Sequence, residues 1–168
     1  DVTESYGGTY FASAVGEVNA TTLMHEKGAI IGGEGNGGVI YPAIHSGRDA
    51  MVGVALFLSN LAHKKMTVSE LKKTYPEYHI AKNKIELSDK GLIDKILSEL
   101  KVIYAHENVN DIDGVKISFE DKREWVHLRK SNTEPIIRIY SEAPTEEEAV
   151  KLSEKVIAVA EKIISSAK

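Results

Sequence analysis

Cysteine is absent from this 168-residue sequence, which excludes disulfides, thiolate catalysis and cysteine-ligated zinc. No apolar run reaches the roughly 18–20 residues that a membrane-spanning helix needs. The chain has slightly fewer basic than acidic residues: 21 Lys and Arg and 25 Asp and Glu give a formal net charge of -4. Phosphate backbones repel such a chain, so it is not a general nucleic-acid binder, although a local basic site for one small anion is compatible with this charge.

The composition that is present is typical of a folded protein. Hydrophobic residues make up 42% and charged residues 27% of the chain, and the length suffices for one domain or two small ones. The chain begins at Asp1 without a basic-then-apolar leader, and a helix tail over residues 1–6 is stopped by Gly7-Gly8. We therefore expect a fragment or a processed product.

The first part of the chain alternates between short helical and apolar patterns. Apolar runs predict strands over 9–13 and 29–31, and a weak helical pattern covers 18–27. Residues 49–62 are apolar on most sides, which predicts a buried helix packed on a sheet. The sequence pattern of residues 66–82 differs from that of the apolar segment before it, and we interpret this stretch as a connector between two units.

The second part of the chain has a clearer order. Its predicted elements are a strand over 84–87, a helix over 88–104, strands over 115–119, 125–129 and 136–140, and a helix from Pro144 onward. Ser88-Asp89 can cap the first helix, and Thr145 with Glu148 predicts a capping box on the second. This βαβββα order implies a small open sheet with two helices on one face.

The stretch 129–138 lies between two predicted strands and could carry chemistry. It combines a guanidinium, two hydroxyls, an amide and the N–H groups of a turn, from Arg129, Ser131, Asn132 and Thr133. A phosphate dianion is bound by such a combination of positive charge and short hydrogen-bond donors. Arg138 can return to the same place across the hairpin. The alternative is a polar hairpin loop whose side chains only satisfy local backbone groups.

The glycine-rich stretch 32–38 is the second candidate. Its spacing matches G-x-G-x-x-G, but Pro42 stands where a dinucleotide-binding helix should run, and no acid follows about 20 residues on. Glu34 and Asn36 lie two apart and point the same way if the stretch is extended, where both can bind sugar hydroxyls. The alternative is a flexible glycine-rich turn, which spacing alone favours.

Together, the two loops resemble those of the α-D-phosphohexomutase superfamily, which includes phosphoglucomutase, phosphomannomutase and phosphoglucosamine mutase. The matching segments are Gly33-Glu34-Gly35-Asn36-Gly37-Gly38, Arg129-Lys130-Ser131-Asn132-Thr133-Glu134-Pro135 and Val15-Gly16-Glu17. The resemblance covers essentially the whole chain, from inside the third of four family domains through the fourth. The glycine-rich loop looks most like that of bacterial phosphoglucosamine mutase-like or phosphomannomutase-like members, and we expect a cytoplasmic protein.

The resemblance implies a division of the chain into domains. Residues 1–65 would be the later part of an α/β third domain with an open sheet, and 66–82 a connector. Residues 83–168 would be an α+β fourth domain related to the TATA-box-binding fold. Part of a domain leaves a sheet edge and apolar surface exposed, so we expect self-association.

The resemblance also implies roles for the two loops. Glu34 and Asn36 match the loop that holds sugar hydroxyls, with Asn in place of the usual Ser. The phosphate loop supplies Arg129, Ser131, Asn132 and Thr133, assisted by Arg138. Gly38 stands where many members have His, and Glu17 where many have a basic residue, so the preferred hexose stays undecided.

The implied activity is interconversion of hexose 6-phosphate and hexose 1-phosphate. It uses a phosphoserine of the first domain, a hexose 1,6-bisphosphate intermediate and Mg²⁺ bound by aspartates of the second domain. Neither of those two loops occurs in this sequence, so we expect no catalytic or metal-binding residue in the chain and no activity from it alone. Two other classes stay open: a non-enzymatic module that binds a phosphosugar or another small anion, and a structural domain that pairs through its sheet edge.

Overall fold

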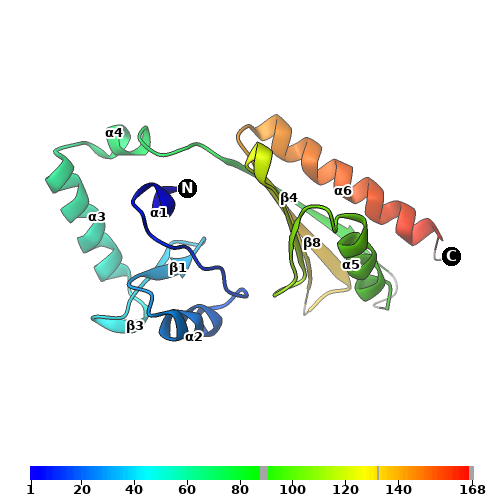
Figure 1. Cartoon of the computed structure of the whole chain (residues 1–168), viewed down its shortest axis with the longest axis horizontal. Helices are drawn as coiled ribbons and strands as arrows, with labels where there is room; N and C mark the ends of the chain where they lie inside the picture. The colour runs from blue at the N-terminus through cyan, green and yellow to red at the C-terminus, as the bar shows by residue number, and fades with distance from the viewer. Residues whose placement is uncertain (88–90, 132, 167–168) are drawn as a thin grey trace. The chain divides into compact units, whose positions relative to one another are not determined.

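The computed structural model describes residues 1–87, 91–131 and 133–166 (Figure 1). The predicted helix caps Ser88 and Asp89 and the candidate site residue Asn132 lie outside the described residues. The chain forms two compact units, Asp1–Pro76 and Glu77–Lys168, here called unit 1 and unit 2. Across the described ranges, no helix is long and apolar enough to cross a membrane.

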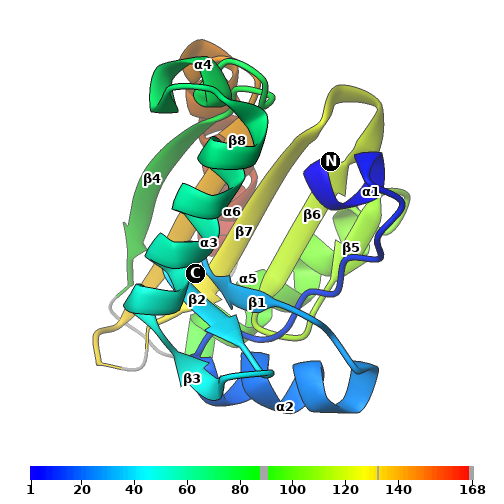
Figure 2. The same cartoon turned by 90° about the vertical axis from the view of Figure 1, so that its left-hand side faces the viewer.

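Unit 1 contains a small antiparallel sheet in the order β1-β2-β3 (Figure 2). Its elements are α1 (Val2–Ser5), α2 (Glu17–Lys27), β1 (Gly32–Glu34), β2 (Gly38–Tyr41), β3 (His45–Arg48), α3 (Ala50–Lys64) and α4 (Val68–Lys72). α1 and α2 confirm the predicted helix tail at the start of the chain and the weak helix that follows it. The buried core is small, because only Ala20, Met24 and Ile40 form its cluster.

The strands predicted over residues 9–13 and 29–31 are wrong. Residues 9–13 adopt no regular structure, and β1 begins only at Gly32. The apolar residues just before β1, Ile30 and Ile31, are 79% and 55% exposed. An apolar run becomes a strand when a neighbouring strand pairs with it, and here the pairing with β2 starts after the run.

Helix α3 confirms the helix predicted over 49–62 but not its burial. It begins where Asp49 accepts a hydrogen bond from the Val52 backbone N–H at 3.0 Å. Val52 is the buried residue of this helix, and α3 contacts β2. Met51 and Leu58 are 77% and 56% exposed, so much of the apolar surface of α3 is not covered by unit 1.

Unit 2 contains a five-stranded antiparallel sheet in the order β4-β8-β7-β6-β5. Its elements are β4 (His79–Glu86), α5 (Gly91–Ile103), β5 (Asn108–Asn110), β6 (Val115–Phe119), the 3-10 helix η1 (Glu120–Lys122), β7 (Glu124–Lys130), β8 (Ile136–Ala143) and α6 (Glu146–Ser166). The predicted order βαβββα is therefore corrected to βαββββα by the additional strand β5. β5 has three residues and one apolar side chain, which is too little for alternation to be recognised.

Both helices of unit 2 pack on one face of its sheet, as predicted (Figure 1). The core joins side chains of both helices to alternate strand residues: Ile93, Ile96, Leu100, Val156, Ala160, Ile117, Val126, Leu128, Ile137 and Ile139. The predicted pairing at the start of α6 is present, because the Glu148 N–H donates to Thr145 Oγ1 at 3.2 Å. The architecture is mixed α/β with open sheets. Residues of β7 and β8 that alternate with the core residues belong to the face opposite the helices.

Candidate functional site

The loop between β7 and β8 carries the residues that the sequence suggests for phosphate binding. Arg129 of β7 lies directly opposite Arg138 of β8, so their side chains start close together on one face. This register confirms that Arg138 returns beside Arg129 across the hairpin. The loop is closed where the Ser131 N–H donates to the Ile136 carbonyl oxygen at 3.0 Å.

Two hydroxyl groups lie near one another inside this loop. Ser131 Oγ and Thr133 Oγ1 are 3.5 Å apart, and Ser131 is only 7% exposed. The Pro135 carbonyl oxygen accepts a hydrogen bond from the Leu87 N–H at 3.0 Å, which ties the loop to the residue after β4. The short donors of the loop are thus held in place by backbone bonds, which limits the freedom they would lose on binding an anion.

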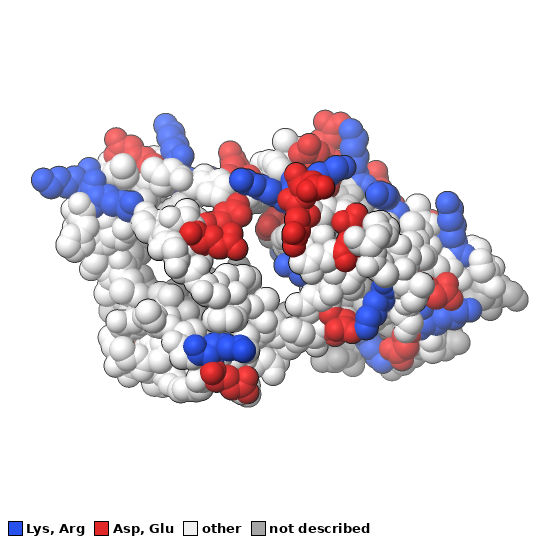
Figure 3. All heavy atoms as spheres, viewed as in Figure 1, with Lys and Arg blue, Asp and Glu red and all other residues white. Residues whose placement is uncertain are grey.

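The two arginines of the hairpin each pair with a carboxylate. Arg129 Nη1 lies 3.2 Å from Asp113 Oδ2, and Arg138 Nη2 lies 3.7 Å from Glu134 Oε2. The positive charge of the loop is therefore compensated before any ligand arrives. Figure 3 shows the same mixture on a larger scale, with acidic and basic side chains interspersed over the visible face of unit 2.

A third basic residue, Lys84, lies in line with Arg129 and Arg138 across the strands, and it was not identified from the sequence. Lys84 of β4 lies directly opposite Arg138. Its Nζ is 2.7 Å from Glu86 Oε1, and this hydrogen bond raises the pKa of Lys84 and lowers the pKa of Glu86. The alternation of Lys82 and Lys84 was a signal in the sequence, but only the strand register places Lys84 in line with the two arginines.

The glycine-rich loop joins β1 to β2 as a tight turn. Gly37 has a φ of 91°, and its N–H donates to the Glu34 carbonyl oxygen at 3.0 Å. The Asn36 side-chain oxygen accepts from the Gly38 N–H at 3.1 Å. Glu34 and Asn36 therefore do not share one extended strand, so the condition under which both would point the same way is not met, and the stretch is the turn that its spacing favours. Gly33 is required for close pairing, because a Cβ there would lie 2.2 Å from the Gly38 carbonyl oxygen.

Arg48 of β3 joins two carboxylates beside this loop, and sequence reasoning missed it too. Its Nη1 lies 3.4 Å from Glu34 Oε2. Its Nε and its backbone N–H each donate to the Glu17 carboxylate at 2.9 Å, and these bonds lower the pKa of Glu17. Arg48 thereby links α2, β1 and β3 around Glu34.

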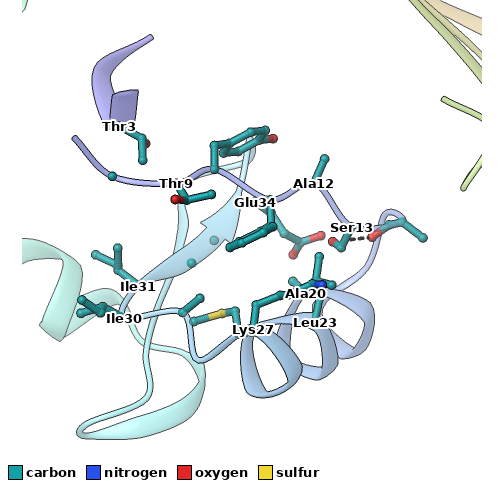
Figure 4. A pocket seen from close by; sticks show the side chains of 18 of the residues that line it. Thr3, Thr9, Ala12, Ser13, Ala20, Leu23, Lys27, Ile30, Ile31 and Glu34 are labelled. Atoms are coloured by element: carbon teal, nitrogen blue, oxygen red, sulfur yellow. Dashed lines mark hydrogen bonds between the residues drawn. The ribbon is translucent and has the colours of Figure 1, made fainter. Parts of the chain in front are cut away.

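Glu34 also lines a cavity of about 710 Å³ within unit 1 (Figure 4). The Glu34 side chain is 19% exposed, and Thr9, Ser13 and Lys27 add hydroxyl and ammonium groups to the same lining. Leu23 and other apolar side chains form the rest of the wall. The cavity has the size of a small-molecule site and a few polar groups for orientation.

The described residues offer no metal centre. Among them, no group of three His, Cys, Asp or Glu side chains is arranged to hold a metal ion. The side chains of residues 1–87, 91–131 and 133–166 therefore do not fit the Mg²⁺ that the resemblance implies for the family. No chemical step on this chain is assigned to a metal.

The order of the two units and their loops corresponds to a known arrangement of domains. Residues 1–78 match the family model "Phosphoglucomutase/phosphomannomutase, alpha/beta/alpha domain III". Residues 82–159 match "Phosphoglucomutase/phosphomannomutase, C-terminal domain". The chain belongs to the phosphoglucomutase/phosphomannomutase family. The resemblance inferred from the two loops is therefore confirmed, and the chain corresponds to domain III and the C-terminal domain of this family.

Individual members of the phosphoglucomutase/phosphomannomutase family are similar along most of the chain. A "Probable phosphoglucosamine mutase" of Methanopyrus kandleri is 30% identical over 165 residues, which are 98% of this chain and 36% of that protein. A "Phosphoglucosamine/phosphogalactosamine mutase" of Sulfurisphaera tokodaii is 36% identical over 82% of this chain and 30% of its own length. The chain thus spans about a third of the length of these relatives. Both are archaeal proteins, so the expectation of a bacterial member has no support.

Solved structures of the family share the fold. The structure of a phosphoglucomutase/phosphomannomutase family protein from Burkholderia thailandensis superposes with a TM-score of 0.73 at 22% identity. The match covers 94% of this chain and 34% of that one. The structure of a putative phosphomannomutase from Thermus thermophilus superposes with a TM-score of 0.66 at 24% identity, over 95% of this chain and 33% of that one.

Proposed function

We propose that this chain supplies the substrate-binding portion of an enzyme that interconverts hexose 6-phosphate and hexose 1-phosphate. The observation that carries the proposal is the cross-strand pair Arg129 and Arg138, which lies beside the buried Ser131 in the unit that matches the C-terminal domain of the family. A guanidinium fork with adjacent hydroxyls suits a phosphate dianion in geometry and in charge. As part of this proposal, unit 2 is related to the TATA-box-binding fold.

The two loops would bind different parts of one phosphosugar. Arg129, Ser131, Asn132 and Thr133 would hold the phosphate, with Arg138 beside them. In the other loop, the Glu34 carboxylate would accept hydrogen bonds from hydroxyls or from a sugar ammonium, and the Asn36 amide would donate. Glucosamine 6-phosphate is the first substrate to test, because both archaeal relatives carry glucosamine phosphates in their names.

The chemistry itself would come from other parts of the whole enzyme. A phosphoserine there would exchange its phosphoryl group with the sugar through a hexose 1,6-bisphosphate, with Mg²⁺ to balance the charge of the transferring group. Either phosphate of that intermediate must sit in the Arg129 loop in turn, so the loops of this chain must bind features that both monophosphates share. The chain alone would bind substrate and would be inactive.

The test is a titration of the isotope-labelled chain with glucosamine 6-phosphate, followed by amide NMR shifts. We expect saturable shifts at Ser131 and Thr133 with a dissociation constant on the order of millimolar, because a few charge-assisted hydrogen bonds outweigh ordering costs only slightly. Arg129→Ala should abolish these shifts. Lys122→Ala removes the same charge from the exposed helix η1 and should keep them. Shifts that persist in Arg129→Ala would overturn the assignment.

A further inference from the structure

The turn between β5 and β6 is locked onto β7 next to the phosphate loop. Gly114 has a φ of 82°, and a Cβ at this position would lie 2.2 Å from the Leu128 carbonyl oxygen and 3.1 Å from the Arg129 Cα. Only glycine permits so close an approach in this conformation. The residue before it, Asp113, is therefore held at a fixed place along β7.

Asp113 contacts β7 at two points. Its backbone carbonyl oxygen lies 2.5 Å from His127 Nε2, and its carboxylate oxygen Oδ2 lies 3.2 Å from Arg129 Nη1. His127 and Arg129 are two residues apart on one strand and share the face opposite the helices. The β5–β6 turn is thus bonded to β7 through both the backbone and the side chain of Asp113.

The pair of Arg129 and Asp113 differs from the neighbouring pair of Arg138 and Glu134 in its burial. The two side chains are 29% and 30% exposed, whereas those of Arg138 and Glu134 are 43% and 59% exposed. Glu134 also belongs to the β7–β8 loop itself, so it moves with the loop. Asp113 comes from a separate, locked turn and can hold the guanidinium independently of the loop.

We propose that Asp113 is a positioning residue, which orients the Arg129 guanidinium before phosphate binds. Asp113 accepts a hydrogen bond from one terminal nitrogen of the guanidinium, which has five N–H donors in all, so this contact leaves the group able to bind an anion as well. An arginine that is already ordered loses less conformational freedom on binding. This inference rests on the proposed phosphate-binding role of Arg129.

The alternative is that Asp113 merely competes with the phosphate as a counter-ion. The two roles predict opposite signs for Asp113→Asn, which keeps the size of the side chain and removes its charge. A competitor, once neutralised, would leave Arg129 freer and tighten phosphate binding. A positioning residue, once neutralised, weakens binding even though the site has become more positive.

The experiment compares Asp113→Asn with Asp111→Asn, a matched loss of charge in the same turn. Asp111 is exposed and pairs with Lys101, away from Arg129. In titrations with inorganic phosphate and with glucosamine 6-phosphate, we expect Asp113→Asn to weaken binding roughly fivefold, because a mobile guanidinium must then be ordered when the anion binds. Asp111→Asn should leave the affinity unchanged or slightly tighter. Unchanged or tighter binding in Asp113→Asn would overturn the proposal.

A second measurement needs no ligand. The Nε–Hε NMR signal of Arg129 should report an ordered guanidinium in the unaltered chain and in Asp111→Asn, and a mobile one in Asp113→Asn. Unchanged order in Asp113→Asn would overturn the proposal whatever the titrations show. If the unaltered chain binds neither anion, the proposed phosphate site fails in this chain, and this measurement still decides what Asp113 does. Amide shifts of the α5 and α6 core check that each variant is folded.

Discussion

At the scale of single residues, charge pairs engage the charged side chains at both candidate loops, whereas backbone hydrogen bonds hold the loops themselves. Arg129 and Arg138 could be anticipated from the sequence, because a hairpin between two predicted strands brings its two ends together. Asp113, Lys84 and Arg48 could not. Asp113 reaches Arg129 only because Gly114 fits against β7, and that contact depends on a register that no local pattern encodes.

The Glu17 carboxyl predicts a pH dependence of unit 1. Hydrogen bonds from Arg48 hold its pKa below the ordinary value of 4.5 in the folded chain. A carboxyl with a lowered pKa contributes stability above its unfolded pKa and loses it as pH falls through the folded value. Glu17→Gln should therefore lower the urea midpoint of unit 1 at pH 7, and the difference should vanish at strongly acidic pH.

Amide NMR signals of β1, β2 and β3 give the readout for this prediction, because they report on unit 1 alone. Glu26→Gln is the matched control, since Glu26 is an exposed residue on the same helix, α2. It should leave the midpoint nearly unchanged at both pH values. A Glu17→Gln variant as stable as the unaltered chain at pH 7 would show that the contacts with Arg48 contribute nothing measurable to folding.

At the scale of elements, the sequence predicts unit 2 much better than unit 1. Helices α5 and α6 and strands β6, β7 and β8 have patterns that their own core satisfies, so local preference and burial agree. In unit 1, the apolar runs over 9–13 and 29–31 have strand composition but gain no ladder partner. An apolar pattern shows that a segment is able to form a strand. Whether it does so depends on a neighbouring strand that pairs with it.

The start of α6 supplies a test at this scale. The Glu148 N–H donates to Thr145 Oγ1, and the Thr145 hydroxyl donates to the Glu148 carboxylate at 2.7 Å. Thr145→Ala removes both bonds and should destabilise unit 2 by about 1 kcal/mol, as the loss of a helix cap does. Thr145→Ser keeps the oxygen and should restore most of the stability. Trp125 fluorescence in urea follows unit 2, because the single tryptophan lies on β7.

The cap prediction fails in a recognisable way. If Thr145→Ala and Thr145→Ser both unfold at the midpoint of the unaltered chain, water replaces the cap without loss. If both are destabilised alike, the methyl group of threonine matters rather than its hydroxyl. Only a difference between the two variants assigns the stability to the hydrogen bonds.

At the scale of the whole molecule, the exposed apolar surface of α3 is the feature that should govern behaviour in solution. Met51, Val54 and Leu58 follow one another at helical spacing and are 77%, 52% and 56% exposed. Burial of such a side chain contributes about 1.5–3 kcal/mol, so a surface of several favours association. We expect the chain to form dimers or larger species at high concentration, in keeping with the self-association predicted from the sequence.

Light scattering after size-exclusion chromatography, over a range of concentrations, tests this expectation. Leu58→Glu places a charge on this apolar row and should shift the chain toward monomer. Val102→Glu is the matched control, because Val102 is 75% exposed and belongs to α5 of unit 2 and not to this row, and it should leave the mass unchanged. A monomer at every concentration would contradict the prediction. Equal dissociation by both variants would assign the association to net charge, because each adds one negative charge, and only a selective effect of Leu58→Glu attributes it to α3.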